Sequence, residues 1–146
     1  MTEPKISIVI PSLNQGRFIG QTIQSMLDQG YPHLEILVMD GGSTDNTLEI
    51  LKSFSGQITW FSEKDQGQSH AINKGLRQST GDICGYLNSD DVLLPGALQS
   101  IIAAFKSEDS LWVTGDYQVL IPAARKSIAW LCRISASSVV FHPSLL

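Results

Sequence analysis

The stretch Ile83-Cys84-Gly85-Tyr86-Leu87-Asn88-Ser89-Asp90-Asp91 runs from an apolar strand directly into a polar tip with two adjacent carboxylates. A second apolar run, Val92-Leu93-Leu94, follows, and Pro95 then opens a helical pattern. Because neighbouring carboxylates repel each other, a cation stabilises such a pair, and Mg²⁺ and Mn²⁺ prefer oxygen ligands. The same residues also fit a turn followed by an acidic helix start, which the helix dipole favours. The rest of the chain decides between a metal site and a turn.

The sequence before this tip alternates between apolar strand patterns and amphipathic helix patterns. Strands are predicted at 6–10, 34–39, 58–61 and 82–87, and Pro11 is expected to end the first of them. Helices are predicted between these strands and after Pro95, from apolar residues at the 3.6-residue period. This order predicts an α/β fold, with a mostly parallel sheet and helices on both faces. Strand patterns at 112–117, 118–121 and 138–141 have little helix between them, so a mixed or antiparallel late section is expected.

The composition limits the class of protein. A chain of 146 residues without repeats fits a single domain, and its net charge of −4 argues against electrostatic binding of nucleic acid. The two cysteines, Cys84 and Cys132, lie far apart in apolar runs, which favours free buried thiols over a disulfide. Neither a signal-peptide layout nor an apolar run of about 18 residues is present, so a soluble cytoplasmic protein is expected.

Polar side chains follow each of the four predicted strands. They are Ser12 and Asn14 after the first, Asp40 after the second, Glu63 and Asp65 after the third, and Asn88 to Asp91 after the fourth. Ligands of open parallel sheets bind outside the carboxyl ends of the strands, so these residues predict a shared binding rim. This arrangement favours the metal interpretation of the Asp90-Asp91 pair.

The ligand expected at this rim is a metal-bound diphosphate. Neither Gly-x-Gly-x-x-Gly nor Gly-x-x-x-x-Gly-Lys-[Ser/Thr] is present, so the glycine-rich phosphate cradles are unsupported. An acidic rim without a basic cradle fits phosphate whose charge a metal has neutralised. Asp40, at a strand end, is suited to accept hydrogen bonds from a ribose hydroxyl or a base N–H.

Four stretches of the chain resemble the family 2 glycosyltransferases with the GT-A fold. They are Ser7 to Asn14, Tyr31 to Thr47, Ser62 to Ser69 with Asn73-Lys74-Gly75, and Gly81-Asp82 leading to Leu87-Asn88-Ser89-Asp90-Asp91. The resemblance covers essentially the whole chain. It implies a nucleotide-diphosphate-sugar donor, most often a UDP-sugar, with Mg²⁺ or Mn²⁺ bridging the diphosphate. It also implies transfer to a glycan, lipid-linked or other hydroxyl acceptor in polysaccharide or cell-wall biosynthesis, in the cytoplasm or peripherally at the membrane.

The resemblance also assigns roles to individual residues. The nucleotide-binding set is Pro11, Ser12, Asn14, Asp40, Asp65, Asn73, Asn88 and Ser89. Within it, Asp40 would hold the base, Asp65 would lie near base or ribose, and Ser89 would lie by the ribose. Asn88-Ser89-Asp90 occupies the place of the family's Asp-x-Asp pattern. Asp90 would be the metal ligand there, helped by the charge of Asp91.

Two departures from the family pattern shape the expectation. Asn88 stands where the pattern has its first acid, and the segment that normally supplies the general base would follow residues 138–141, whereas the chain stops at Leu146. Asp116 is a late acid in a strand-like setting and is a candidate base. We therefore expect one GT-A-like domain over 1–146, with a nucleotide-sugar-binding core at 1–110 and the start of an acceptor-side region at 111–146, incomplete at its C-terminus.

Two alternatives to an active transferase stay open. One is an inactive, truncated module that binds a nucleotide sugar, and an edge left exposed by the missing part would then allow self-association. The other is a nucleotidyltransferase, which would carry a glycine- and lysine-rich signature in the first loop. The loop Ser12-Leu13-Asn14-Gln15-Gly16-Arg17 lacks that signature.

Overall fold

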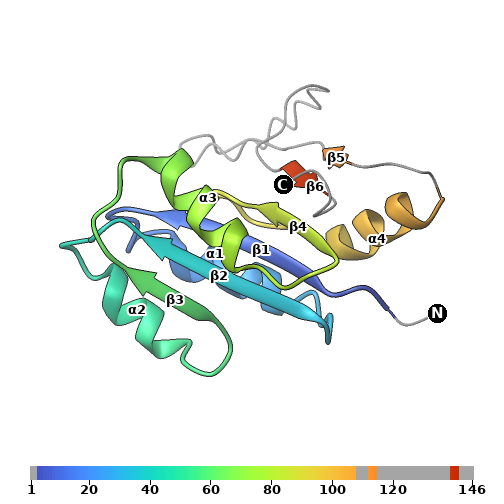
Figure 1. The fold of residues 1–146 in the computed structure, drawn as a ribbon. Coiled ribbons are helices and arrows are strands. Elements are labelled where there is room, and N and C mark those ends of the chain that lie inside the picture. Colours follow the sequence, from blue (N-terminus) through green and yellow to red (C-terminus); the bar gives the residue numbers. More distant parts are fainter. Residues whose placement is uncertain (1–2, 108–111, 115–138, 142–146) are drawn as a thin grey trace, which may run out of the picture.

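The computed structural model describes residues 3–107, 112–114 and 139–141. Its elements, in chain order, are β1 (Ile6–Ser12), α1 (Ile19–Leu27), β2 (Leu34–Asp40), α2 (Thr47–Ser53), β3 (Thr59–Ser62), α3 (Gln68–Gln78), β4 (Ile83–Tyr86), α4 (Ala97–Ser107), β5 (Trp112–Thr114) and β6 (Val139–Phe141). The strands form one sheet in the order β3-β2-β1-β4-β6-β5 (Figure 1). β1 to β4 run parallel, and β6 runs antiparallel to both β4 and β5. The predicted mostly parallel sheet with a mixed late section is confirmed.

Side chains that alternate along β1 divide the core between two faces of the sheet. Ile6, Ile8 and Ile10 belong to a buried cluster that includes residues of α1, α2 and α4. Val9 belongs to a second cluster with Ala71 and Leu76 of α3. In Figure 1, α3 crosses in front of the sheet and α1 lies behind it. Helices therefore cover both faces, as the alternating sequence pattern predicts.

Pro11 does not end β1, contrary to the expectation from the sequence, because its missing N–H falls where no ladder bond is needed. The strand continues to Ser12, and Pro11 lies opposite Met39 of β2. The Val9 carbonyl accepts a bond from Leu87 on the β4 side, and the Ser12 carbonyl accepts one from Gly41 on the β2 side. Since backbone groups alternate in direction along a strand, the Pro11 nitrogen points to the β4 side. The β1–β4 pairing has already ended there, at Val9, so no ladder bond is lost.

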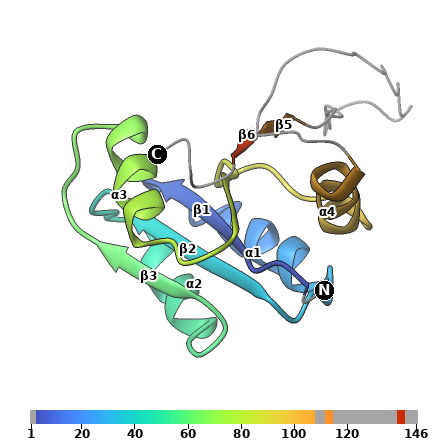
Figure 2. The same ribbon diagram turned by 45° about the vertical axis from the view of Figure 1, so that its right-hand side comes forward.

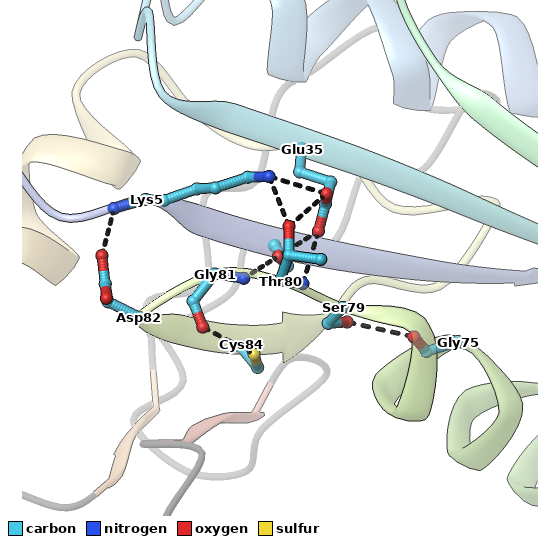
Figure 3. Close-up of polar contacts among 9 residues, drawn as sticks. Lys5, Glu35, Gly75, Ser79, Thr80, Gly81, Asp82 and Cys84 are labelled. Carbon is cyan, nitrogen blue, oxygen red and sulfur yellow. Dashed lines mark hydrogen bonds and ion pairs between the residues drawn. The ribbon is translucent and has the colours of Figure 1, made fainter.

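A polar cluster around Glu35 ties β1, β2 and the start of β4 together at the end of the sheet where these strands begin (Figure 3). The Glu35 carboxylate accepts bonds from Lys5 Nζ at 2.8 Å, Thr80 N at 2.9 Å and Thr80 Oγ1 at 2.7 Å, and one from the Ser7 hydroxyl. Ser7 Oγ in turn accepts from Gly81 N at 2.9 Å. Burial alone would raise the pKa of Glu35, but these bonds outweigh it and lower the pKa to about 2.

Several expectations fall on residues outside the described ranges. These are the strand pattern at 118–121, the end of the one at 112–117, Cys132 and the candidate base Asp116. The division of the domain near residue 110 stays a prediction, and so does self-association through a C-terminal edge. Within the described residues, no helix is both long enough and apolar enough to cross a lipid bilayer.

Candidate functional site

The four parallel strands end together at one rim of the sheet, as the sequence predicts. Ser12 pairs with Asp40, Asp40 pairs with Ser62, and Tyr86 at the end of β4 lies opposite Val9. A cleft of about 440 Å³ opens at this rim. It is lined by Pro11, Ser12, Leu13, Gln15, Asp65, Gly67, Gln68, Ala71, Asn88, Ser89 and Asp90. Loops from three strand ends and the first turn of α3 therefore enclose one cavity.

Ser12 contributes an unpaired hydroxyl to this cleft. The residue is only 5% exposed, yet its Oγ has no hydrogen-bond partner among the described residues. An unpaired buried hydroxyl costs on the order of 1–3 kcal/mol, so it needs a reason to persist. A polar ligand in the cleft would supply the missing partner.

Asp40 lies beneath the rim and does not line the cleft. It is 2% exposed, and its carboxylate accepts bonds from the backbone N–H of Gly42 at 3.1 Å and of Ser43 at 2.9 Å. The hydroxyls of Ser43 and Ser62 also donate to it, the second at 2.6 Å. In this structure Asp40 shapes the turn after β2, and its contact with a base stays a prediction.

The loops after β1 and β2 are joined by a series of hydrogen bonds. Asn14 adopts a left-handed backbone with φ 52° and donates its N–H to Ser43 Oγ at 2.7 Å, while its own Oδ1 accepts the Thr44 N–H at 2.8 Å. Gln15 N donates to Thr47 Oγ1 at 3.0 Å, and Gly16 N donates to the Asp45 carboxylate at 3.0 Å. The predicted nucleotide residue Asn14 thus lies outside the cleft lining and fixes the loop that carries Leu13 and Gln15.

Asp65 is one of two carboxylates that line the cleft, and Asp90 is the other. Its Oδ1 accepts the Gly67 N–H at 2.8 Å, and a Cβ atom on Gly41 would come 2.8 Å from its Oδ2. A glycine at 41 therefore leaves room for Asp65 to lie over the turn after β2. Asp65 is half-buried, and its contact with a base or ribose stays a prediction.

The polar tip after β4 is held from both sides. Ser89 is buried, and its carbonyl accepts a bond from Thr22 Oγ1 of α1 at 2.8 Å. Asn88 Oδ1 accepts from Gln68 Nε2 at 2.7 Å, and Asn88 Nδ2 donates to Asp91 Oδ2 at 3.0 Å. Asp91 does not line the cleft. Asp90 lines the cleft and is exposed to solvent. No described residue donates a hydrogen bond to its carboxylate.

Two further residues from the sequence-derived stretches lie away from the cleft lining. Asn73 is exposed on α3, so its nucleotide contact stays a prediction. Lys74 forms an ion pair with Glu63, and this bond lowers the pKa of the Glu63 carboxyl.

The donor set at the tip fits a divalent cation that receives most of its ligands from a bound diphosphate. Within 3–107, 112–114 and 139–141, no group of three His, Cys, Asp or Glu side chains forms a self-contained metal site. Mg²⁺ commonly takes one or two protein carboxylates and completes its shell with phosphate oxygens and water. The unengaged Asp90 carboxylate fits that mode, and Asp91 adds charge next to it.

The structure adds Leu13, Gln15, Gly67, Gln68 and Ala71 to the site, none of which stands out in the sequence as a ligand-binding residue. Gln68 and Ala71 belong to the first turn of α3, which reaches the tip after β4. Only the position of Gln68 and Ala71 in the chain could have indicated that they belong to the site, because α3 starts at the rim where β3 ends.

The comparisons with known proteins show the family of the chain. The model of glycosyl transferase family 2 matches residues 7–121, which include all of the cleft lining. The chain belongs to glycosyltransferase family 2. A glycosyltransferase of Nostoc sp., itself uncharacterized, is 34% identical to this family 2 chain over 113 residues, which are 75% of the chain and 35% of the relative.

Solved structures show the same GT-A fold. The mannosyltransferase PcManGT from Pyrobaculum calidifontis, in complex with GDP-Man and Mn²⁺, superposes with a TM-score of 0.71 at 24% identity, over 78% of this chain and 36% of that one. TarS 1–349 of S. aureus, in complex with UDP-GlcNAc, superposes with a TM-score of 0.73 at 22% identity, over 84% of this chain and 37% of that one. This family 2 chain therefore spans about a third of the length of each of these proteins.

Proposed function

We propose that this chain binds a nucleotide-diphosphate sugar in the rim cleft and serves the donor half of an inverting, metal-dependent glycosyltransferase. The observation that carries the proposal is the cleft itself, since Ser12 and Asp90 both line it and neither the Ser12 hydroxyl nor the Asp90 carboxylate has a hydrogen-bond partner among the described residues. Family membership supports it, and so do the related structures that hold GDP-Man with Mn²⁺ and UDP-GlcNAc. A UDP-sugar is the donor we expect.

Each part of the cleft has a role in this proposal. Pro11, Ser12 and Asp65 bind the nucleoside, with Asp40 shaping the floor and Asn14 the loop above it. Ser89 and Asn88 lie by the ribose, and Asn73 borders the site from α3. Asp90 binds Mg²⁺ or Mn²⁺ together with the donor diphosphate, and Asp91 adds negative charge beside it. A cation held there would supply positive charge to stabilise the leaving diphosphate.

The reaction is a displacement at the anomeric carbon. An acceptor hydroxyl oxygen forms the new bond to this carbon, the bond to the diphosphate oxygen breaks, and a nucleoside diphosphate departs with the electron pair. A general base takes the hydroxyl proton. Asp116 is the candidate base in this sequence, and the acceptor is a glycan, a lipid-linked saccharide or another hydroxyl compound. We propose a cytoplasmic location, with peripheral membrane attachment where the acceptor is lipid-linked.

Calorimetric titration of UDP, GDP and dTDP, each with and without Mn²⁺, tests the binding step. We expect one nucleotide to bind, and to bind more tightly with Mn²⁺ present. Asp90→Ala should remove the Mn²⁺-dependent gain, whereas Glu49→Ala, an exposed carboxylate on α2, should retain it. Absence of nucleotide binding at millimolar concentration, or an unchanged Mn²⁺ effect in Asp90→Ala, would overturn the proposal.

Turnover separates an enzyme from a binding module. The chain is incubated with the nucleotide sugar of the base that binds, Mn²⁺ and a panel of hydroxyl acceptors, and release of nucleoside diphosphate is measured. Binding without transfer to any acceptor would favour the donor-binding module.

A further inference from the structure

A chain of side-chain hydrogen bonds connects the first residue of α3 to the tip after β4. Gln68 Nε2 donates to Asn88 Oδ1 at 2.7 Å, across 20 positions of sequence, and Asn88 Nδ2 donates to Asp91 Oδ2 at 3.0 Å. Neither Gln68 nor Asp91 needs this arrangement for burial, because Gln68 is exposed and Asp91 is half-buried. The connection therefore calls for an explanation other than satisfaction of buried polar groups.

The direction of each bond in this chain follows from Asp91. A carboxylate at neutral pH can only accept hydrogen bonds, so Asn88 must turn its NH₂ group towards Asp91. The Asn88 carbonyl oxygen then faces Gln68, and only the NH₂ group of Gln68 can donate to it. If either amide were reversed, two acceptors would face each other and a bond would be lost. One carboxylate thus sets the orientation of both amides.

Two further hydrogen bonds hold the backbone of the tip. Asp91 N donates to Asn88 O at 3.2 Å and closes the turn, and Thr22 Oγ1 of α1 holds the Ser89 carbonyl. In the sequence Asp90 lies between Asn88 and Asp91, whose side chains are hydrogen-bonded to each other, and its own carboxylate accepts no bond from any described residue. The direction of Asp90 is therefore set by the turn, and the turn is connected to α3 through Asn88.

We propose that Gln68 is a positioning residue for the cation: by holding Asn88, it keeps the 88–91 turn in the geometry that directs Asp90 into the cleft. This inference rests on the proposed function, since it assigns Gln68 a part in the same metal–diphosphate site. It also explains why an amide at 88 is compatible with that site, because Asn88 donates to Asp91 where an aspartate would repel it. Residues that orient metal ligands contribute about 10- to 100-fold to metal affinity.

Calorimetry on the whole chain tests this role. Gln68→Met keeps the length of the side chain, removes its donors and adds no charge. We expect the Mn²⁺-dependent gain in UDP affinity, which is the ratio of the affinities with and without Mn²⁺, to fall about tenfold. The matched control is Gln78→Met, an exposed position at the other end of α3, which should bind as the wild type does.

A double-mutant cycle separates action through Asn88 from an independent effect. If Gln68 acts through Asn88, Gln68→Met should have no further effect in an Asn88→Ala background. Additive losses, or an unchanged Mn²⁺-dependent affinity in Gln68→Met while the wild type binds, would overturn the inference and leave the proposed function standing. Failure of the wild type to bind any nucleotide would overturn both. Circular dichroism confirms that each variant is folded.

Discussion

Gly75 of α3 lies directly against Val9 of β1: a Cβ atom on the glycine would come 2.4 Å from Val9 Cγ1 and 3.0 Å from Met39 Cγ. Gly75→Ala forces helix and sheet apart, and overpacking of this kind costs about 1–3 kcal/mol. The better helix propensity of alanine returns up to about 1 kcal/mol. We expect a net loss of roughly 1–2 kcal/mol in the free energy of unfolding, measured by urea titration.

Gly20→Ala is the matched control for this prediction. Gly20 lies in α1, and the nearest atom to its Cβ position is Ile50 Cγ2 at an ordinary 3.4 Å. Its stability should stay the same or rise by up to about 1 kcal/mol. Equal stability of the two alanine variants would show that α3 leaves room for a methyl group between Gly75 and Val9.

Two serines in β1 should respond in opposite ways to alanine. Ser12 Oγ is buried without a partner in the described part of the chain. Ser12→Ala should therefore leave stability unchanged or raise it by about 1 kcal/mol, while nucleotide affinity falls about 2- to 10-fold. Ser7 Oγ donates to Glu35 and accepts from Gly81, so Ser7→Ala should lower the free energy of unfolding by about 1–3 kcal/mol. Urea titration and calorimetry measure the two quantities. A clear destabilisation by Ser12→Ala would mean that its hydroxyl is satisfied in the free protein.

Ser43 connects the two loops above the cleft floor. Its hydroxyl donates to Asp40 and accepts the Asn14 N–H, and the residue is 8% exposed. Ser43→Ala should lower the free energy of unfolding by about 1–3 kcal/mol and weaken nucleotide binding, because the loop at 13–16 loses an anchor. Ser53→Ala, an exposed position on α2, is the control and should affect neither. Loss of stability with unchanged affinity would show that the remaining bonds hold the loop.

Glu35 should make stability depend on pH in the acid range. The pKa of its carboxyl falls from 4.5 to about 2 on folding. A group with a depressed pKa in the folded state stabilises the fold fully above its unfolded pKa. This contribution is lost as the pH falls from about 4.5 through 2. Urea titrations at pH 7, 5 and 3 should therefore show a decline that is smaller in Glu35→Gln.

Glu35→Gln should itself lower the free energy of unfolding by about 1–3 kcal/mol at pH 7, because the charged hydrogen bonds of Glu35 are intact in the wild type at that pH. Glu49→Gln, exposed on α2, serves as the control and should follow the wild-type pH profile. Parallel pH profiles for Glu35→Gln and the wild type would contradict the prediction.

The alternating core was predictable from the sequence because its strands and helices carry distinct periods. Ile6, Ile8 and Ile10 on one face of β1 and Val9 on the other reflect that alternation. Pro11 was misjudged, because a proline is excluded only where its nitrogen meets a neighbouring strand, and that depends on where β4 ends. The pairing of β6 beside β4 joins segments far apart in the chain, which local patterns do not specify.

The site was predictable as a rim but not in its detailed contacts. Ser12 and Asp90 follow strands, and both line the cleft. The engagement of Asp40 by Ser43 and Ser62 depends on loop geometry, which residue types alone do not reveal. Gln68 carries no motif of its own, and its role emerges only when α3 is placed against the tip after β4.

The antiparallel strand beside β4 has a consequence for biosynthesis. β4 ends at Tyr86 and β6 begins at Val139, and the two lie side by side in the sheet (Figure 1), with β6 next to β5 (Figure 2). At ~5–20 residues per second, a ribosome needs roughly 3–10 s to make the intervening segment. During that interval the nascent protein presents the outer edge of β4, with its unpaired backbone groups, to the surrounding medium. A chaperone that shields strand edges would be most useful in this window, before residues 139–141 emerge to cover β4.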